Sequence, residues 1–236
     1  MANFKTHISV AAALSGCLAT GFLEVGIAAP KDVWLYFALG TLGGILPDID
    51  ANNSIPGRML FSFFAIVLAF LTLFSRANVY SIVELSILWI VTYVVVRYII
   101  FQLFAMLTIH RGIFHSILAA IFFCFLTTDI SYYLFNFNPL NAWVCGSFVF
   151  IGYIIHLILD EIYSVNLIGA NIKRSFGTAL KIISANMKTT SLLFLATVLA
   201  FSMAPSSKSF VTTVLSLDTY KSVKVKLLPK AGWFKL

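Results

Sequence analysis

Residues 141–162 read NAWVCGSFVFIGYIIHLILDEI. The stretch carries no charged residue before Asp160 and is long enough to cross about 30 Å of hydrocarbon as one helix. We therefore predict a membrane-spanning helix here. His156 and Asp160 are four residues apart near its end, so in a helix they project from one face, about one turn apart, and could share an ion.

The composition of the whole chain agrees with a membrane protein. Of its 236 residues 60% are hydrophobic, 23 are Phe, and the mean hydropathy is +0.96. This is more apolar surface than a soluble core of that size buries. The net charge of +7 then places Lys and Arg outside the bilayer, against anionic head groups, so membrane lipids are expected partners. No aromatic and basic pattern predicts nucleic-acid binding.

Further apolar runs predict an all-α, polytopic integral membrane helix bundle with six or seven spans. The segments 33–47 and 189–204 are short and either cross a thinned bilayer or re-enter it. The complete set of predicted spans is 8–28, 33–47, 59–75, 81–109, 113–135, 141–162 and 189–204. The fourth contains Arg97, which is either a structural arginine near the helix end or needs a partner or a snorkelling route.

Two segments lie outside these spans. Residues 1–204 are predicted to form the embedded domain and 205–236 a basic C-terminal tail, with a short hairpin around Asp218 to Lys221 because apolar and Lys residues alternate after it. Residues 171–188 mix basic and apolar side chains, which predicts an amphipathic helix in the head-group region or a basic loop.

The cysteines predict neither disulfides nor a thiolate metal site. Cys17, Cys124 and Cys145 are odd in number, widely spaced and inside apolar runs. Cys17 follows a sequence that resembles a lipoprotein cleavage signal. The apolar run before it is short for such a signal and continues beyond it, so an uncleaved helix is favoured.

Histidines and aspartates cluster at the ends of the predicted spans. Counting crossings places all of them on one side of the membrane, which favours a single convergent metal site. The predicted ligands are His7, Asp48, Asp50, His110, His115, His156 and Asp160. Nitrogen and oxygen donors of this kind suit a divalent metal, first Zn²⁺, with Mn²⁺ or Fe as alternatives. Seven ligands exceed the need of one tetrahedral ion, so one or two ions are expected.

Local sequence suggests how these ligands are presented. His110 and His115 are five apart, and a helix break at Gly112 would turn both rings toward one pocket. Asp48 and Asp50 would face the same way in extended backbone. Arg111 offers a planar donor fork for phosphate, or is a basic anchor at the membrane surface. Asp50 or Glu161 could act as a general base.

The charges of the connecting segments predict the orientation. Lys5, Arg58, Arg111, Lys173, Arg174, Lys181 and Lys188 lie on the ligand side, against Lys31 and Arg76 on the other. By the positive-inside rule the site faces the cytoplasm. The six lysines after Pro205 oppose this if 189–204 crosses the membrane.

The ordered motifs resemble a known family. His7, then GILPDID at 44–50, HRGIFHS at 110–116 and HLILD at 156–160, over residues 1–180, resemble the YdjM-like family of bacterial inner-membrane metal-dependent hydrolases. That family is distantly similar to zinc-dependent phospholipase C enzymes, which implies phosphoester hydrolysis. After Asp160 such proteins often continue with Thr and a Gly-containing turn, whereas this chain continues with Glu161, which leaves the pocket walls and the substrate unspecified.

The expected function is hydrolysis of a phosphoester or lipid head group by a metal-activated water. Two other classes of membrane protein would use the same ligands. A divalent-metal transporter would hold them near the bilayer midplane, with a polar path beyond. A metal-clamped scaffold without catalysis would close the coordination shell.

Overall fold

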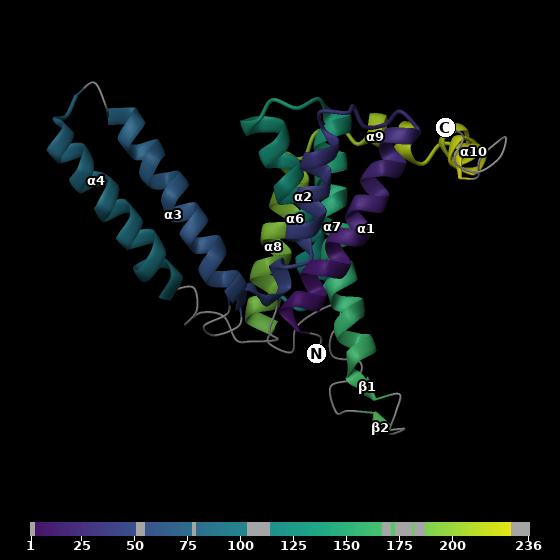
Figure 1. Ribbon diagram of the computed structural model, residues 1–236, viewed down its shortest axis with the longest axis horizontal. Helices are drawn as coiled ribbons and strands as arrows, with labels where there is room; N and C mark the ends of the chain where they lie inside the picture. The colour runs from purple at the N-terminus through teal and green to yellow at the C-terminus, as the bar shows by residue number, and fades with distance from the viewer. Residues whose placement is uncertain are drawn as a thin grey trace, which may run out of the picture. The chain divides into compact units, whose positions relative to one another are not determined.

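The computed structural model describes residues 3–50, 55–76, 79–102, 114–166, 171–172, 181 and 187–227. Its longer helices are α1 Phe4–Glu24, α2 Val33–Gly43, α3 Ile55–Arg76, α4 Ile82–Val94, α6 Ile117–Asp129, α7 Pro139–Ser164, α8 Met187–Met203, α9 Lys208–Val214 and α10 Leu217–Lys226 (Figure 1). Shorter elements are the 3₁₀ helix η1 Leu46–Asp50, the π-helical turns η2 Val95–Ile100 and η3 Ile130–Leu134, and the antiparallel strands β1 Val165–Asn166 and β2 Asn171–Ile172.

Each of the seven predicted apolar segments contains a helix over most of the residues that the structure describes. Five of these helices are long and apolar enough to cross a membrane: α1, α3, α4 with η2, α6 with η3, and α7. A sixth results if α8 and the segment 208–226, bent by 87°, count as one span. α2, with 11 residues, rises only about 16 Å and is too short to cross alone. The prediction of an all-α membrane bundle is confirmed.

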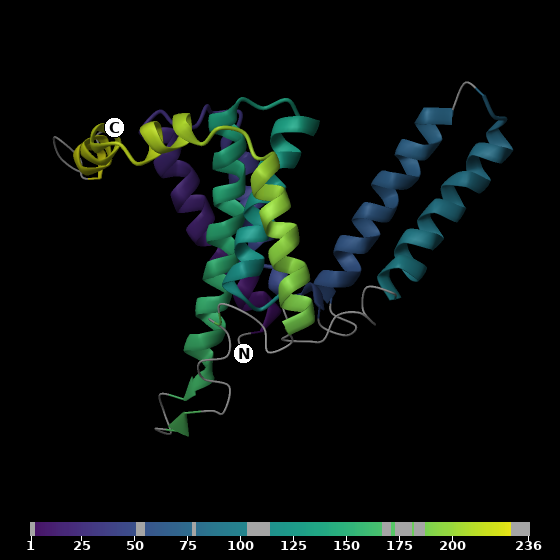
Figure 2. The same ribbon diagram turned by 180° about the vertical axis from the view of Figure 1, so that it is seen from behind.

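The helices divide into two compact units. The bundle unit comprises residues 1–45 and 116–236, and the hairpin unit comprises residues 46–115. In the bundle unit α7 packs against α1, α2 and α6, and α6 also packs against α8, as the view from behind shows (Figure 2). In the hairpin unit α3 packs along α4 and η2 and also touches η1.

The core of the bundle unit explains the position of α7. Of its 26 residues half are buried, more than in any other candidate span, so α7 is the central helix. Tyr36 of α2 stacks on Phe148 of α7, and Phe22 of α1 meets the same ring edge-on. Aromatic pairs of this geometry add to the free energy of area burial.

The C-terminal tail differs from its prediction. The hairpin expected around Asp218 to Lys221 is wrong, because these residues lie in α10. The Ser216 side chain caps α10 by accepting from the Thr219 N–H at 3.0 Å, Asp218 stands in the first turn and lysines stand in the last, all of which favour a helix. The Lys226 ammonium donates to the Glu24 carbonyl of α1.

The other surface prediction, an amphipathic helix over 171–188, falls mainly on residues 173–180 and 182–186, outside the described part of the chain. The division of the chain at residue 205 stays a prediction. At that point the Trp143 indole N–H of α7 donates to the Pro205 carbonyl at 2.9 Å.

Candidate metal centre

A seam of small residues brings α1, α2 and α7 together at the site. The buried residues of α1 recur every four positions, at His7, Ala11, Ser15 and Ala19, and so form one stripe. A Cβ on Gly40 of α2 would meet the Ser15 hydroxyl. Small residues at such a seam let helix backbones approach closely in a membrane.

Glycines also let α2 and α7 approach each other closely. A Cβ on Gly152 would collide with the Gly40 carbonyl, and one on Gly43 would collide with the Val149 carbonyl of α7. His156 and Asp160 follow Gly152 at intervals of four along the same face of α7. The close approach at Gly152 therefore places His156 next to the end of α2.

His156 is oriented by that helix end. Its Nδ1 lies 2.8 Å from the Gly44 carbonyl oxygen, which can only accept, so the contact assigns a proton to Nδ1. In a neutral ring Nε2 then carries a lone pair. This nitrogen lies 3.9 Å from Asp160 Oδ2. A backbone carbonyl that fixes the tautomer through the far ring nitrogen is the usual support of a metal-binding histidine.

His7 enters the site from the first turns of α1. The Asn3 side chain caps this helix by accepting from the Thr6 N–H at 2.8 Å, which fixes where the helix begins. His7 is thereby the fourth helical residue. Its ring stacks on that of His156 with centroids 3.7 Å apart, and its Nε2 lies 3.3 Å from Asp160 Oδ1.

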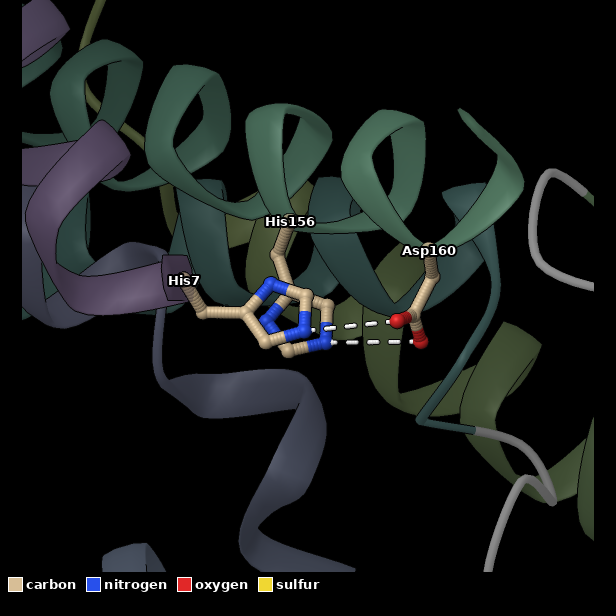
Figure 3. Close-up of side chains that lie close together, drawn as sticks. All are labelled: His7, His156 and Asp160. Carbon is tan, nitrogen blue, oxygen red and sulfur yellow. Dashed lines mark ion pairs between the residues drawn. The ribbon is translucent and has the colours of Figure 1, made fainter. Parts of the chain in front are cut away.

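Two imidazole nitrogens thus converge on one carboxylate (Figure 3). His7, His156 and Asp160 are each at most 2% exposed. One ligand atom of each lies within 4.8 Å of the other two. Ligand atoms bound about 2.0 Å from a tetrahedral zinc lie about 3.3 Å from one another. The donor set and its spacing therefore fit a divalent metal, with His7, His156 and Asp160 as three ligands.

The family model described as YdjM inner membrane protein matches residues 1–226. The chain belongs to the YdjM inner membrane protein family. The match extends past the motif region to residue 226 and so includes α8, α9 and α10. No curated protein and no solved structure matches the chain.

The three-ligand group lies at one end of the bundle unit of this YdjM-family protein. α1 begins and α7 ends at the end marked N in Figure 1, whereas α9 lies at the opposite end. Asp160 stands four residues before the end of α7, about 6 Å along the axis. The crossing count predicted that the ligands lie close together on one side of the membrane, and His7, His156 and Asp160 do lie together; the side of the membrane stays a prediction.

A second pair of predicted ligands meets within the hairpin unit. His115 Nε2 lies 3.8 Å from Asp48 Oδ1, and His115 is buried. Asp48 belongs to η1, which contains Pro47. This turn follows Gly43 and Gly44, where α2 ends. The expected extended backbone from Asp48 to Asp50 is wrong. In a 3₁₀ helix the backbone turns by about 120° per residue, so it does not place positions 48 and 50 on one face.

Several predicted site residues have no described side chain. His110, Arg111 and Gly112 lie outside the described residues, and only the backbone of Asp50 is described. Glu161 is half-buried on α7 and, as the neighbour of Asp160, projects about 100° around the helix from it. The roles of these residues, and the convergence of all seven ligands on one site, stay predictions.

Sequence reasoning did not identify the groups that position the ligands. These are the Gly44 carbonyl and the glycines that set the helix spacing, Gly40 and Gly152. A signal was present, because Gly40 and Gly44 are four apart in an apolar helix, a spacing typical of close helix contacts in membranes.

Proposed function

We propose that this YdjM-family membrane protein is a metal-dependent hydrolase that cleaves a phosphoester, with a lipid head group as the favoured substrate. The observation that carries the proposal is the convergence of His7 Nε2, His156 Nε2 and Asp160 on one buried point. Zn²⁺ is the first candidate ion, with Mn²⁺ or Fe as alternatives.

A cation at this point would stabilise the three donors, whose lone pairs otherwise face one another. The neutral His156 ring presents a lone pair to the Asp160 carboxylate, and two acceptors face each other only if a proton or a metal lies between them. The stacked His7 ring aims a second nitrogen at the same carboxylate. Two imidazoles and one carboxylate are a common ligand set of catalytic zinc.

Three protein ligands favour hydrolysis over a structural role. Structural zinc sites are closed by four protein ligands, whereas catalytic sites keep one position for water or substrate. A bound divalent metal lowers the pKa of such a water toward neutrality and polarises a phosphoryl oxygen. Arg111 is proposed to stabilise the phosphoryl charge, and Asp50 or Glu161 to accept a proton. Asp48, His110 and His115 are proposed to hold a second ion where two are bound, which leaves the first ion with three protein ligands and a position for water.

The position of the group along its helices favours a surface reaction over transport. His7 is the fourth residue of α1 and Asp160 the fifth from the end of α7, so both lie near span ends rather than at the centre. A transporter would hold its ion near the bilayer midplane. A site near the head groups suits a lipid phosphoester, and the excess of Lys and Arg that the sequence places on the ligand side supports a cytoplasmic orientation.

The test combines metal analysis with a lipid-hydrolysis assay on the full chain in nanodiscs. Wild-type protein should hold at least one divalent ion per chain and release a phosphorylated or dephosphorylated head group, and a chelator should stop the release. Asp160→Asn should lose both properties. The matched control is Asp129→Asn, which changes a buried carboxylate in α6, away from the three ligands. This variant should keep both the bound metal and the activity.

Two results would contradict the proposal. Protein without bound metal after growth and purification in zinc, manganese and iron would remove its basis. Metal-loaded protein that is inactive on a broad phosphoester and lipid panel, but carries the ion across vesicles, would assign it to transport instead.

A further inference from the structure

The hairpin unit contains a pocket that the proposed hydrolase site does not use. Its volume is about 570 Å³, within the range of small-molecule sites. α3 contributes Arg58, Ser62 and an apolar wall, and η2 contributes Arg97. The lining residues are Arg58, Met59, Ser62, Phe63, Ile66 and Arg97. Two arginines therefore border one pocket at the open end of a membrane hairpin, where α3 begins and η2 ends.

Arg97 lies against two aromatic rings. Its guanidinium carbon lies 5.2 Å from the Tyr98 ring centroid and 5.4 Å from that of Phe101. Phe101 in turn packs on Phe61 of α3, with centroids 5.2 Å apart. Cation–π contacts use the face of the guanidinium, whereas its N–H groups point outward in the plane and match a phosphate. The π-helical turn around Arg97 is an irregularity frequent at functional sites.

The charges of the pocket favour an anion. In the described part of the hairpin unit no ion pair joins Arg58 or Arg97 to a carboxylate. Glu84 is engaged by the Ser81 backbone and hydroxyl at the start of α4, the far end of that helix from η2. Charged residues within a candidate span are costly unless they have a partner, and the partner of two arginines is negatively charged.

The wall of the pocket is suited to an acyl chain. Met59, Phe63 and Ile66 are 62%, 61% and 43% exposed and follow one another at intervals of four and three along α3. This spacing makes them one stripe on a helix face. Exposed apolar side chains on a membrane hairpin contact lipid tails, so a charged head and an apolar tail are accommodated next to each other.

We propose that this pocket binds an anionic phospholipid, with the phosphate between Arg58 and Arg97 and an acyl chain along the Met59, Phe63 and Ile66 stripe. Phosphatidylglycerol fits this chemistry. A choline head group would bring a positive charge against two arginines, so phosphatidylcholine binds less well. The site does not involve the metal ligands and does not depend on hydrolysis.

The experiment counts lipids retained by the full chain in native mass spectrometry, with phosphatidylglycerol and phosphatidylcholine offered at equal concentrations. Wild-type protein should retain phosphatidylglycerol preferentially, and the Arg58→Gln, Arg97→Gln double variant should bind it on the order of tenfold more weakly. Arg76→Gln is the matched control, because Arg76 lies in the last turn of α3, away from the pocket, and should leave the preference unchanged.

Two further variants test the guanidinium of Arg97 and the independence of lipid binding from the metal. Arg97→Lys retains the charge but loses the planar fork, so it should give an intermediate loss and serves if the double variant does not fold. His7→Ala should keep the lipid preference while losing metal, which separates this proposal from the hydrolase proposal. Equal binding of both lipids by wild type, or an unchanged preference in the folded double variant, would overturn it. Displacement by free glycerol 3-phosphate would show that the pocket recognises phosphate rather than a lipid.

Discussion

The rings of His7 and His156 lie face to face, with centroids 3.7 Å apart and planes inclined by 11°. One comes from the first turns of α1 and the other from the last third of α7. Two imidazolium cations at this spacing, both buried, would repel strongly, so the stack disfavours a positive charge on both rings at once. Neutral imidazole is the form that binds metals. The ring stack and the shared contact with the Asp160 carboxylate therefore both fit two histidines that bind one metal ion.

We expect His156→Asn to remove metal without dismantling the helix contact. An Asn amide places an N–H group near the position of Nδ1, so it can still donate to the Gly44 carbonyl, but it has no atom in place of Nε2. Metal affinity should fall by at least about tenfold, since even changes to supporting residues around a ligand cost that much. Elemental analysis after equilibration in a metal buffer measures it.

The control for that substitution is Asp129→Asn, which changes a buried carboxylate outside the three-ligand group. Its metal content should equal that of wild type. Full metal occupancy in both His156→Asn and Asp160→Asn would show that the ligands are wrongly assigned.

Gly152→Ala should separate α2 from α7 and weaken the site indirectly. The added methyl group would collide with the Gly40 carbonyl, a backbone atom that cannot move alone. Overpacking of this kind costs about 1–3 kcal/mol of unfolding free energy, and it should also draw the Gly44 carbonyl away from His156. Thermal unfolding and metal content, measured together, test both effects.

Gly21→Ala is the matched control, because nothing lies within 4 Å of a Cβ at this helical position. Ala has a higher helix propensity than Gly, so stability should be equal or higher by up to about 1 kcal/mol. Similar losses in the two variants would mean that glycine flexibility, rather than close packing, matters at Gly152.

The helices and the main ligand pair were predictable because their signals are local. Seven apolar runs predicted seven helices, and the spacing of His156 and Asp160 predicted a shared face. His7 was the weakest candidate by sequence, since a lone residue near the first helix has no local partner. Its role depends on packing between helices far apart in sequence, set by Ala11, Gly44 and Gly152.

The wrong predictions concern patterns with two local solutions. Alternation of Val and Lys after Tyr220 suits a strand, but the same residues form α10 once Ser216 caps a helix. Asp48 and Asp50 were expected in extended backbone, whereas Pro47 lies within the 3₁₀ turn η1, where its fixed φ is compatible with the first turn of a helix. In both places a short-range side-chain or proline constraint outweighed the periodicity.

Ser116→Ala should lower stability without changing the metal content. The Ser116 hydroxyl caps α6 by accepting from the Ala119 N–H at 3.2 Å, and loss of such a cap costs about 1 kcal/mol. It lies next to His115 in the chain but offers no predicted ligand. Loss of metal from folded Ser116→Ala protein would extend the ligand set beyond histidine and aspartate.

Topology can be tested by single-cysteine labelling in a variant whose three native cysteines are replaced by Ala. The crossing count predicts that Cys at positions 52, 112 and 171 is labelled from one side and Cys at position 138 from the other. Asn138 precedes α7, whose other end carries Asp160, so labels at 138 and 171 should differ in side. Labelling of positions 52 and 112 from opposite sides would contradict convergence of the seven ligands.

Substitution of Arg111 can separate metal binding from catalysis. If Arg111 stabilises phosphoryl charge, Arg111→Lys should keep the metal and lower the rate of phosphoester hydrolysis, because an ammonium retains the charge but loses the bidentate fork. Loss of one such donor costs roughly 10²–10³ in kcat. Asp160→Asn should instead lose metal and rate together. Arg111→Lys with an unchanged rate would leave Arg111 as a basic anchor at the membrane surface, the other role that its sequence predicts.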